Sequence, residues 1–325
     1  MDPATVSSRS LKATGRREVV FGRAFFKELH KNKYLYALTV PALLYFVLFA
    51  YLPMFGMVIA FQDYNPIKGI FGSEFVGLKN FDFFFTSNDW LLVTLNTLYL
   101  NTLFIVVGLA VQVAFAVMIS EIGWKPFKRV TQSLMLLPYF ISWPIVSMFA
   151  VSLFATEGGL INKLLVSIQL DPIAFYQNPE VWPATLVLLK VWKATGYGVI
   201  IYLATITSID TEIYEAARID GASRLQAIRH ITIPLLGNTT ILLLLLAVGH
   251  IFYGDFGMIY ALIGDNALLY PTTDVIDTFV FRALRQYSDM SMSSAIGMYQ
   301  SIVGFLLVLG ANTVVRRLNK DAALF

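Results

Sequence analysis

Four ionisable side chains lie inside long apolar stretches of the sequence. Lys190 and Lys193 are three residues apart in one stretch, and His250 and Asp255 belong to another. Ionisable groups within such stretches usually pair with one another or face a water-filled cavity. Three interpretations are open: Lys193 pairs with Asp255, Lys190 extends its ammonium group toward water, or these side chains line a polar pathway.

The sequence has few residues of the types and spacings that enzymatic catalysis needs. The chain contains no cysteine, and its three histidines are scattered at positions 30, 230 and 250. No H-E-x-x-H motif occurs, and the acidic residues of the apolar stretches are isolated rather than paired. The sequence therefore predicts neither a metal site nor a set of convergent catalytic groups, and a membrane-embedded enzyme is disfavoured.

The composition is that of a membrane protein. Of 325 residues, 57% are hydrophobic and only 14% are charged, and the mean hydropathy is +0.67. Soluble domains carry roughly 25% charged residues. We expect a basic N-terminal tail at 1–33 followed by a single transmembrane domain at 34–325. The tail holds Arg9, Lys12, Arg16, Arg17, Arg23, Lys27, Lys31 and Lys33, which could attract anionic membrane lipid.

Six stretches reach the roughly 20 apolar residues that a spanning helix needs. The first cannot be a signal-peptide core, which has only about 7–15 apolar residues. Proline and glycine within spans are tolerated in membrane helices. The sequence therefore predicts an all-α polytopic protein with six transmembrane helices, at about 34–62, 91–119, 131–155, 181–208, 237–264 and 294–315.

The distribution of lysine and arginine predicts the orientation. Most of the 24 basic residues fall in the N-terminal tail, the turn at 120–130, the polar segment at 210–234 and the C-terminal tail. Cytoplasmic segments carry an excess of Lys and Arg. We therefore expect both termini and the polar segment to be cytoplasmic, and the loops 63–90, 156–180 and 263–293 to face outward.

The polar segment (residues 210–234) predicts two short helices. Asp210 is suited to cap the first helix, and Gly221 is suited to a position of positive φ at its end. Ser223 and Gln226 have the spacing of a capping box that starts a second helix. From this pattern alone, the segment could be an amphipathic linker on the lipid surface or a docking element for another protein.

A longer pattern in the polar segment resembles the EAA loop of permeases from bacterial ATP-binding-cassette importers. That loop reads E-A-A, three residues, Gly, nine residues, I-x-L-P. The chain has the same spacing in Glu215-Ala216-Ala217, Gly221 and Ile231-Thr232-Ile233-Pro234. The one departure is Ile233, where the family has leucine. Pro234 is expected to interrupt the helix before the fifth span.

Other segments resemble the carbohydrate-type permeases, and in particular their polysaccharide branch, which includes the alginate importer. They are Glu215–Ala222, Val191-Trp192-Lys193 with Gly196, Gly158–Asn162 and Asp274-Val275-Ile276-Asp277-Thr278. The resemblance covers most of the chain after about residue 35. It implies the fold of a type I importer permease in the bacterial inner membrane. Within the polysaccharide branch, the chain resembles the larger permease subunit of the alginate importer.

The resemblance also implies how the chain is driven. In such permeases the EAA loop forms a coupling helix that docks on a separate ATPase subunit. No Gly-Lys pair occurs in the sequence, so the chain lacks a phosphate-binding P-loop, and ATP and magnesium are expected on that partner. This chain is expected to be neither an enzyme nor the holder of a cofactor. The coupling residues would be Glu215, Ala216, Ala217, Asp220, Gly221, Ala222 and Pro234.

The implied partners are a second, homologous but different permease, two ATP-binding subunits, an extracytoplasmic solute-binding protein and a saccharide; no nucleic acid is expected. The resemblance to the polysaccharide branch favours an acidic saccharide such as an alginate fragment, and the lysines add weaker support, since cationic and aromatic groups could line the pathway. These candidates are Lys190, Trp192, Lys193, Tyr197, Tyr253 and Asp255. The alternative is a stand-alone secondary transporter or channel for a small polar solute, which suits intramembrane charges but leaves the EAA spacing unexplained.

Overall fold

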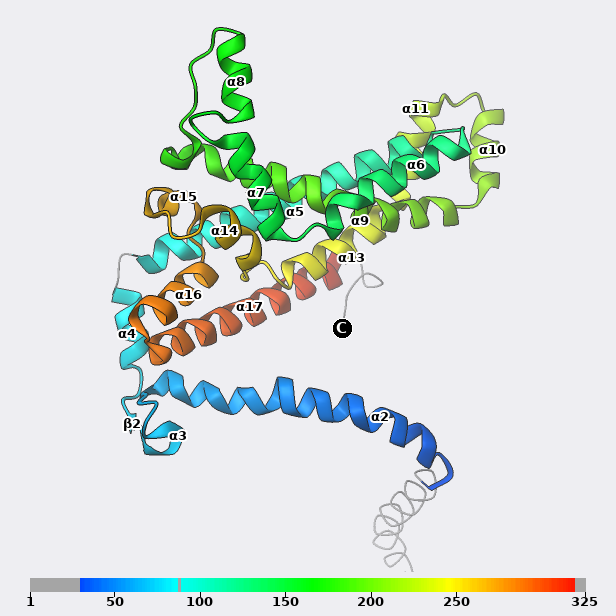
Figure 1. The fold of residues 1–325 in the computed structure, drawn as a ribbon. Helices are drawn as coiled ribbons and strands as arrows, with labels where there is room; N and C mark the ends of the chain where they lie inside the picture. Colours follow the sequence, from blue (N-terminus) through cyan, green and yellow to red (C-terminus); the bar gives the residue numbers. More distant parts are fainter. Residues whose placement is uncertain (1–29, 87–88, 319–325) are drawn as a thin grey trace, which may run out of the picture. The chain divides into compact units, whose positions relative to one another are not determined.

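The computed structural model describes residues 30–86 and 89–318, which are mostly helical (Figure 1). The chain divides into two units, residues 1–58 and 59–325, and each is considered by itself. Most of the expected basic tail, residues 1–29, lies outside the described residues.

The first unit is dominated by one apolar helix that covers the first expected span. It begins as α2 (Lys33–Phe46), passes through a π-helical turn, η1 (Val47–Tyr51), and continues as a 3₁₀ stretch, η2 (Leu52–Phe61), into the second unit. Pro53 has no amide hydrogen for the carbonyl four residues earlier. This loss accounts for the departure from regular α geometry around it.

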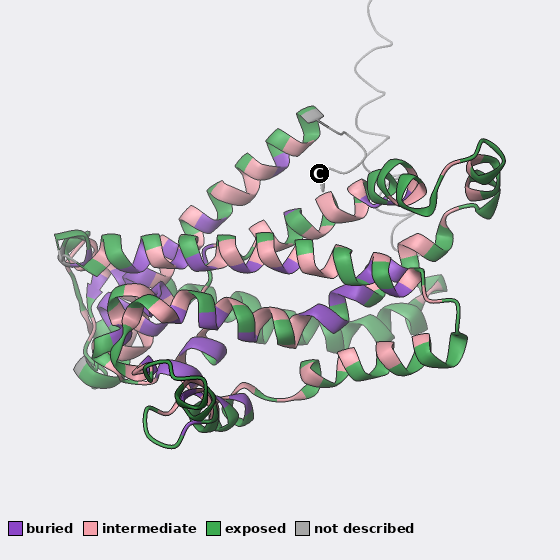
Figure 2. Ribbon diagram, turned by 90° about the horizontal axis from the view of Figure 1, so that it is seen from above, coloured by how far each residue is buried: buried purple, intermediate pink, exposed green. Residues whose placement is uncertain are grey.

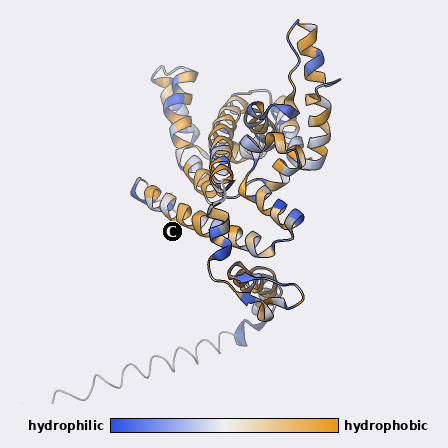
Figure 3. Ribbon diagram, turned by 90° about the vertical axis from the view of Figure 1, so that its left-hand side faces the viewer, coloured by the Kyte–Doolittle hydropathy of each residue, from blue (hydrophilic) through white to orange (hydrophobic). Residues whose placement is uncertain are grey.

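Three further helices match expected spans closely. They are α5 (Asp89–Ser120), α9 (Trp182–Ser208), which follows the short η5 (Pro179–Val181), and α17 (Met290–Leu318). Apolar residues dominate the long helices of the second unit (Figure 3). Within the described residues, four helices are long and apolar enough to cross a membrane, or up to six if two bent pairs are each one span.

The third expected span, 131–155, is a bent pair rather than one helix. Helix α6 (Lys125–Leu136) and the 3₁₀ turn η3 (Leu137–Phe140) are followed by α7 (Trp143–Phe154) at an angle of 97°. Between them, Ile141 and Ser142 are extended, with ψ angles of 130° and 152°. Prolines at the start of η3 and α7 cannot donate to preceding carbonyls, which favours a break here over continuation of the helix.

The fifth expected span, 237–264, also differs from a single helix. It is preceded by α11 (Arg224–Ala227), the π turn η6 (Ile228–Thr232) and α12 (Ile233–Leu235), which meet α13 (Gly237–Val248) at 47°. Helix α13 ends at Val248. Residues 249–255, the connecting segment, are non-helical, and α14 (Phe256–Ile263) follows them.

Short elements link the long helices. Strands β1 (Gln62–Asp63) and β2 (Glu74–Phe75) pair antiparallel around α3 (Gly69–Gly72), with Gln62 opposite Phe75. The remaining elements are α4 (Lys79–Thr86), α8 (Leu160–Ser167), η4 (Phe175–Gln177), α10 (Thr211–Ile219), η7 (Ala267–Leu269), α15 (Tyr270–Thr273) and α16 (Ile276–Tyr287).

Buried residues gather where the long helices face one another (Figure 2). One apolar cluster joins α5, α7, α9 and α14, and includes Phe104, Phe154, Trp182 and Met258. A second cluster joins α4, α5, α16 and α17, and a third joins α5, α9 and Leu236. The apolar packing therefore fixes α5 and α9 at the centre of the second unit.

The segment Asp274–Thr278 fastens the start of α16 to α5. Asp274 is only 4% exposed and forms a bidentate ion pair with Arg282 at 2.5 and 3.2 Å. The Ile276 amide donates to the Thr97 hydroxyl at 3.0 Å. A buried charge is tolerated when it is paired and hydrogen-bonded, so this segment has a clear structural role.

Candidate functional site

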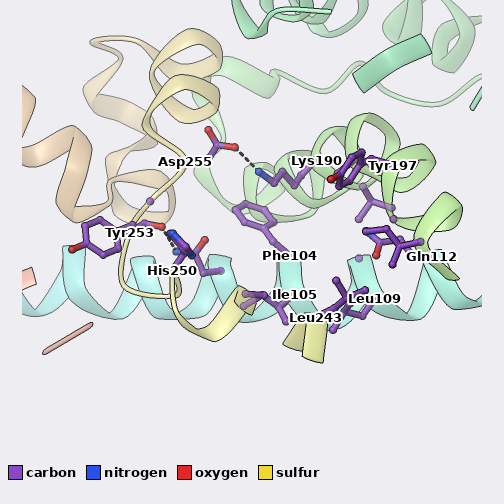
Figure 4. A pocket seen from close by; sticks show the side chains of 18 residues that line it. Phe104, Ile105, Leu109, Gln112, Lys190, Tyr197, Leu243, His250, Tyr253 and Asp255 are labelled. Atoms are coloured by element: carbon purple, nitrogen blue, oxygen red, sulfur yellow. Dashed lines mark hydrogen bonds and ion pairs between the residues drawn. The ribbon is translucent and has the colours of Figure 1, made fainter. Parts of the chain in front are cut away.

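A cavity of about 550 Å³ lies between α5, α9 and the connecting segment (Figure 4). Its apolar lining includes Phe104, Ile105 and Leu243. Its polar lining comes from the three neighbouring elements: Asn101 and Gln112 of α5, Lys190 and Tyr197 of α9, and His250, Tyr253 and Asp255 of the connecting segment. A cavity with apolar walls and a few convergent polar groups is the usual form of a small-molecule site.

Lys190 and Asp255 point toward each other across one end of the cavity (Figure 4). The Lys190 Nζ lies 2.5 Å from the Asp255 Oδ2, and the two side chains are 31% and 25% exposed. The other carboxylate oxygen of Asp255 accepts from the Met258 amide at 3.1 Å and so caps α14. The expected pairing of Lys193 with Asp255 is therefore wrong, and Lys190 does not extend away to water.

Lys193 binds a different element. Its Nζ donates to the backbone carbonyl of Tyr139 at 2.7 Å and lies 5.4 and 5.3 Å from the ring centroids of Tyr139 and Trp143. The Tyr139 carbonyl belongs to the last turn of η3, where a helix supplies no donor of its own. Lys193 thus supplies a hydrogen bond to the backbone at the broken third span and does not line the cavity.

The structure brings together four of the six residues expected in a pathway. Lys190, Tyr197, Tyr253 and Asp255 line the same cavity, whereas Trp192 and Lys193 do not. The Tyr197 ring also stacks on Tyr139 with centroids 5.0 Å apart. Sequence reasoning missed Asn101 and Gln112 as lining residues, although amide side chains in a long uncharged apolar stretch are a usable signal.

The backbone of the connecting segment is held by side chains from neighbouring helices. Asn101 donates to the carbonyls of Ile251 and Tyr253 at 2.9 and 3.0 Å. Gln300 of α17 donates to the Phe252 carbonyl at 2.8 Å. Non-helical backbone at membrane depth is stable only when such partners satisfy it. These two amides therefore make the unwound conformation possible.

Asp277 of α16, outside the candidate spans, holds the same segment from another side. Its Oδ2 accepts from the Gly254 amide at 2.5 Å and from Gln300 Nε2 at 2.9 Å. Burial raises the pKa of the Asp277 carboxyl above its ordinary value of 3.8, although these two hydrogen bonds act in the opposite direction. The cavity-facing end of the segment is thus fixed to α16 and α17.

Gly196 allows α6 and α9 to touch. A β-carbon at this position would lie 1.9 Å from the backbone oxygen of Met135, a distance that only a shift of the backbone could relieve. A β-carbon at Gly198 would instead meet the Gln112 side chain, at 2.1 Å from its Cδ. That side chain has rotatable bonds, so the two glycines differ in how replaceable they are.

The polar segment folds as two helices about Gly221, as expected. The Asp210 side chain accepts from the Glu212 amide at 3.0 Å and caps α10. Gly221 has φ +81°, and the amides of Gly221 and Ala222 donate to Arg218 and Ala217 carbonyls at 3.1 and 2.9 Å. This pair of bonds is a Schellman motif.

The capping box of the second helix is also confirmed. The Ser223 amide donates to the Gln226 side chain at 2.7 Å, and the Gln226 amide donates to the Ser223 hydroxyl at 3.4 Å. The expected interruption at Pro234 comes slightly later, because the π turn η6 accommodates the proline and the bend follows Leu235.

The polar segment exposes apolar side chains on the face that points away from the long helices. Ile219 and Leu225 are 86% and 75% exposed on either side of Gly221. Glu215, Ala216, Asp220 and Gly221 are also exposed, and Ala217 and Ala222 are partly buried. Behind them, the Tyr214 hydroxyl hydrogen-bonds to Thr232 at 3.0 Å and joins the two helices. The two helices of the polar segment thus present an exposed apolar side chain on each side of Gly221.

Residues 105–320 match the family described as the binding-protein-dependent transport system inner membrane component. The chain belongs to this family, whose members are membrane permeases of transport systems. The match extends from the middle of α5 to the end of α17, and so includes the cavity-lining helices and the polar segment.

Two relatives from Bacillus subtilis (strain 168) align over nearly the whole chain. The polygalacturonan/rhamnogalacturonan transport system permease protein YteP is 38% identical over 294 residues, which cover 90% of this chain and 91% of the relative. Protein LplB is 35% identical over 300 residues, which cover 92% and 94%.

Solved structures of a bacterial alginate ABC transporter are similar in fold. One, in complex with a periplasmic protein bound to an alginate pentasaccharide, has a TM-score of 0.83 at 32% identity, and covers 91% of this chain and 98% of the matched chain. Another, described as importing the acidic polysaccharide alginate, has a TM-score of 0.84 at 32% identity, with coverage of 91% and 99%. The type I importer permease fold expected from the sequence is therefore confirmed, with one short pair of strands added to the expected helices, and the chain is a multi-pass membrane protein.

Proposed function

We propose that this chain is one permease subunit of an ATP-driven importer that carries acidic oligosaccharide or polysaccharide fragments across the bacterial inner membrane. The observation that carries the proposal is a connection: the polar segment joins α9 directly to the helices leading into α13, and both α9 and α13 line the cavity. A displacement of the polar segment would therefore act on two walls of the cavity together.

The proposal includes the partners that importers of this family would need. A second, homologous permease would complete the pathway, and two ATP-binding subunits would hold ATP and magnesium. The polar segment would dock on one of these ATPases through Ile219, Leu225 and the small residues beside Gly221. With this segment and both termini in the cytoplasm, the outer loops 63–90, 156–180 and 263–293 would face an extracytoplasmic solute-binding protein.

The chemistry of the cavity supports an acidic saccharide. Lys190 offers a cation to a carboxylate, and Tyr197 and Tyr253 offer aromatic faces and hydroxyl groups to sugar rings. YteP, at 38% identity, is named for polygalacturonan and rhamnogalacturonan, and the structural relatives at 32% identity import alginate. All three of these polymers contain uronic acids, so a uronate oligosaccharide is the substrate class that we propose.

The substrate class is tested with the reconstituted complex of both permeases, the ATPases and the binding protein. Uronate oligosaccharides should stimulate ATP hydrolysis, and neutral oligosaccharides of the same length should stimulate it much less. Stimulation by the neutral series alone would overturn the proposed substrate class. Transport by this chain without an ATPase would instead favour a stand-alone transporter.

The coupling role is tested in the polar segment. Glu215→Lys reverses a charge on the exposed docking face, and Gly221→Pro removes the amide hydrogen and positive φ that form the Schellman motif. We expect either change to abolish transport-coupled ATP hydrolysis while membrane insertion stays intact. Glu212→Lys, one turn earlier on α10, is the matched control and should retain most coupling. Normal coupling in both Glu215→Lys and Gly221→Pro would refute this role.

A further inference from the structure

The cation of the cavity already has a partner within the same cavity. The ion pair between Lys190 and Asp255 is only partly buried, with side chains 31% and 25% exposed, and both residues line the cavity. A solute that enters the cavity can therefore reach Lys190 without first opening the protein. Asp255 presents to it the same chemical group, a carboxylate, that a uronate sugar carries.

Asp255 can leave Lys190 without unfolding its own surroundings. One carboxylate oxygen caps α14 through the Met258 amide at 3.1 Å, and this bond does not involve Lys190. The preceding residues of the connecting segment are held by Asn101, Gln300 and Asp277. Loss of the ion pair would therefore remove an ionic link between the segment and α9 and leave these other contacts in place.

The energetics favour exchange over simple binding. A lysine with no counter-ion inside an apolar span is costly, and Asp255 removes this cost while the cavity is empty. Truncating one partner of such a pair is unfavourable, whereas replacing one carboxylate by another keeps the cation paired throughout. A neutral sugar offers no such replacement and would leave the ion pair closed.

We infer that Lys190 and Asp255 form an exchangeable ion pair, in which a carboxylate of the passing saccharide displaces Asp255 from Lys190 and so releases the connecting segment from α9. This inference rests on the proposed acidic substrate. It assigns Lys190 as the residue that selects for charge and Asp255 as an internal competitor of the substrate. No bond is made or broken covalently, and the net charge of the cavity changes only by that of the substrate.

Direct binding to the purified importer complex, without the binding protein, tests the exchange. The probes are a labelled uronate trisaccharide and a neutral trisaccharide of the same length. Asp255→Asn keeps a side chain that can cap α14 but removes the competing charge, so the dissociation constant for the uronate should fall roughly fivefold, in keeping with a partly exposed ion pair. Lys190→Met should raise it by at least as much.

Exchange predicts that the dissociation constant for the uronate falls in Asp255→Asn and rises in Lys190→Met. A purely structural role predicts a rise in both variants, because damage to the cavity would weaken binding in each. Binding of the neutral probe should be unchanged in both. Asp265→Asn, which disrupts the exposed ion pair with Arg285 at 3.2 Å outside the cavity, is the control and should match the wild type. Unchanged or weaker uronate binding in Asp255→Asn would overturn the inference.

A second comparison remains decisive if Asp255→Asn does not assemble. Lys190→Arg keeps a cation and should retain preference for the uronate, while Lys190→Met should lose it. Equal uronate binding by these two variants would overturn the exchange. If the wild type itself binds both probes equally, the proposed acidic substrate fails instead, and the two failures are thereby distinguished.

Discussion

Two spans of this permease are broken, and a lysine of α9 binds near each break. At the third span, Lys193 donates to the backbone carbonyl of Tyr139; at the fifth, Lys190 pairs with the side chain of Asp255. The Tyr139 carbonyl is part of the backbone and cannot move alone, and Lys193 does not line the cavity. A carboxylate side chain can be replaced by another carboxylate. The two lysines, three residues apart, thus hold one fixed and one exchangeable contact.

The two breaks also differ in how their backbone is satisfied. The first contains only Ile141 and Ser142 in extended conformation, between two regular helical elements. The second is a seven-residue connecting segment, 249–255, whose carbonyls need donors from Asn101 and Gln300. The first break is therefore a corner of the scaffold, whereas the second is an assembled wall of the cavity.

The largest effect is expected at the contact that supports the first break. In Gly196→Ala, the new methyl group would overlap the Met135 carbonyl oxygen. The free energy of unfolding should therefore fall by about 3 kcal/mol, the upper end of the usual range for overpacked cores. Gly198→Ala should be tolerated better, because the Gln112 side chain can rotate away. The yield and thermal unfolding of the purified complex measure both. Equal behaviour of the two variants would show that the α6–α9 approach at Gly196 is not rigid.

A smaller loss is expected at the second break. Asn101→Leu leaves the Ile251 and Tyr253 carbonyls without their donor, which should lower the free energy of unfolding by about 1–3 kcal/mol. The matched control is Gln112→Leu, a cavity-lining amide of the same helix that does not hold the connecting segment. If Asn101→Leu unfolds at the same temperature as its control, the segment does not depend on this amide.

Lys193→Met separates the two lysines directly. It removes the donor of the Tyr139 carbonyl, so stability should fall by about 1–2 kcal/mol. The preference for uronate over neutral trisaccharide should stay, because Lys193 does not line the cavity. Lys193→Arg, which retains a cation and donors, should be nearer to the wild type. Loss of uronate preference in Lys193→Met would break the distinction between the fixed and the exchangeable lysine.

The smallest effect concerns Asp277 and depends on pH. Because burial raises the pKa of this carboxyl in the folded protein, the contribution of Asp277 to stability is most favourable below the ordinary value of 3.8 and is lost as the pH rises through the raised pKa. Asp277→Asn keeps an acceptor for the Gly254 amide and has no charge to bury. The difference in melting temperature, Asp277→Asn minus wild type, should therefore become larger as the pH rises above 3.8. A difference independent of pH would mean that burial does not control this carboxyl.

Local features of the fold were predictable from the sequence, whereas contacts between distant segments were not. The cap at Asp210, the turn at Gly221 and the box of Ser223 with Gln226 each depend on residues within five positions, so their spacing is sufficient. Four of the spans likewise follow from the length of their apolar stretches. These predictions are decided by the chain itself rather than by its neighbours.

The breaks and the partners of the lysines depend on packing. Proline occurs near the first break, but proline is tolerated in many membrane helices, so its presence did not predict a 97° turn. Residues 249–255 include the hydrophobic run Ile251–Tyr253, and their unwinding requires amides contributed by α5 and α17. Lys190 and Lys193 share one face of α9, and only the positions of η3 and α14 decide which of them meets Asp255.

The connection between α9 and α10 determines how much of a movement of one helix is passed on to the other. Only Ile209 and Asp210 separate the two helices, and the Asp210 side chain is bonded to the Glu212 amide at 3.0 Å. A longer loop could bend when α10 moves, and α9 would then follow only part of that movement. A joint of two residues has little freedom to bend, so α9 and both of its lysines would follow a rotation of α10 more closely.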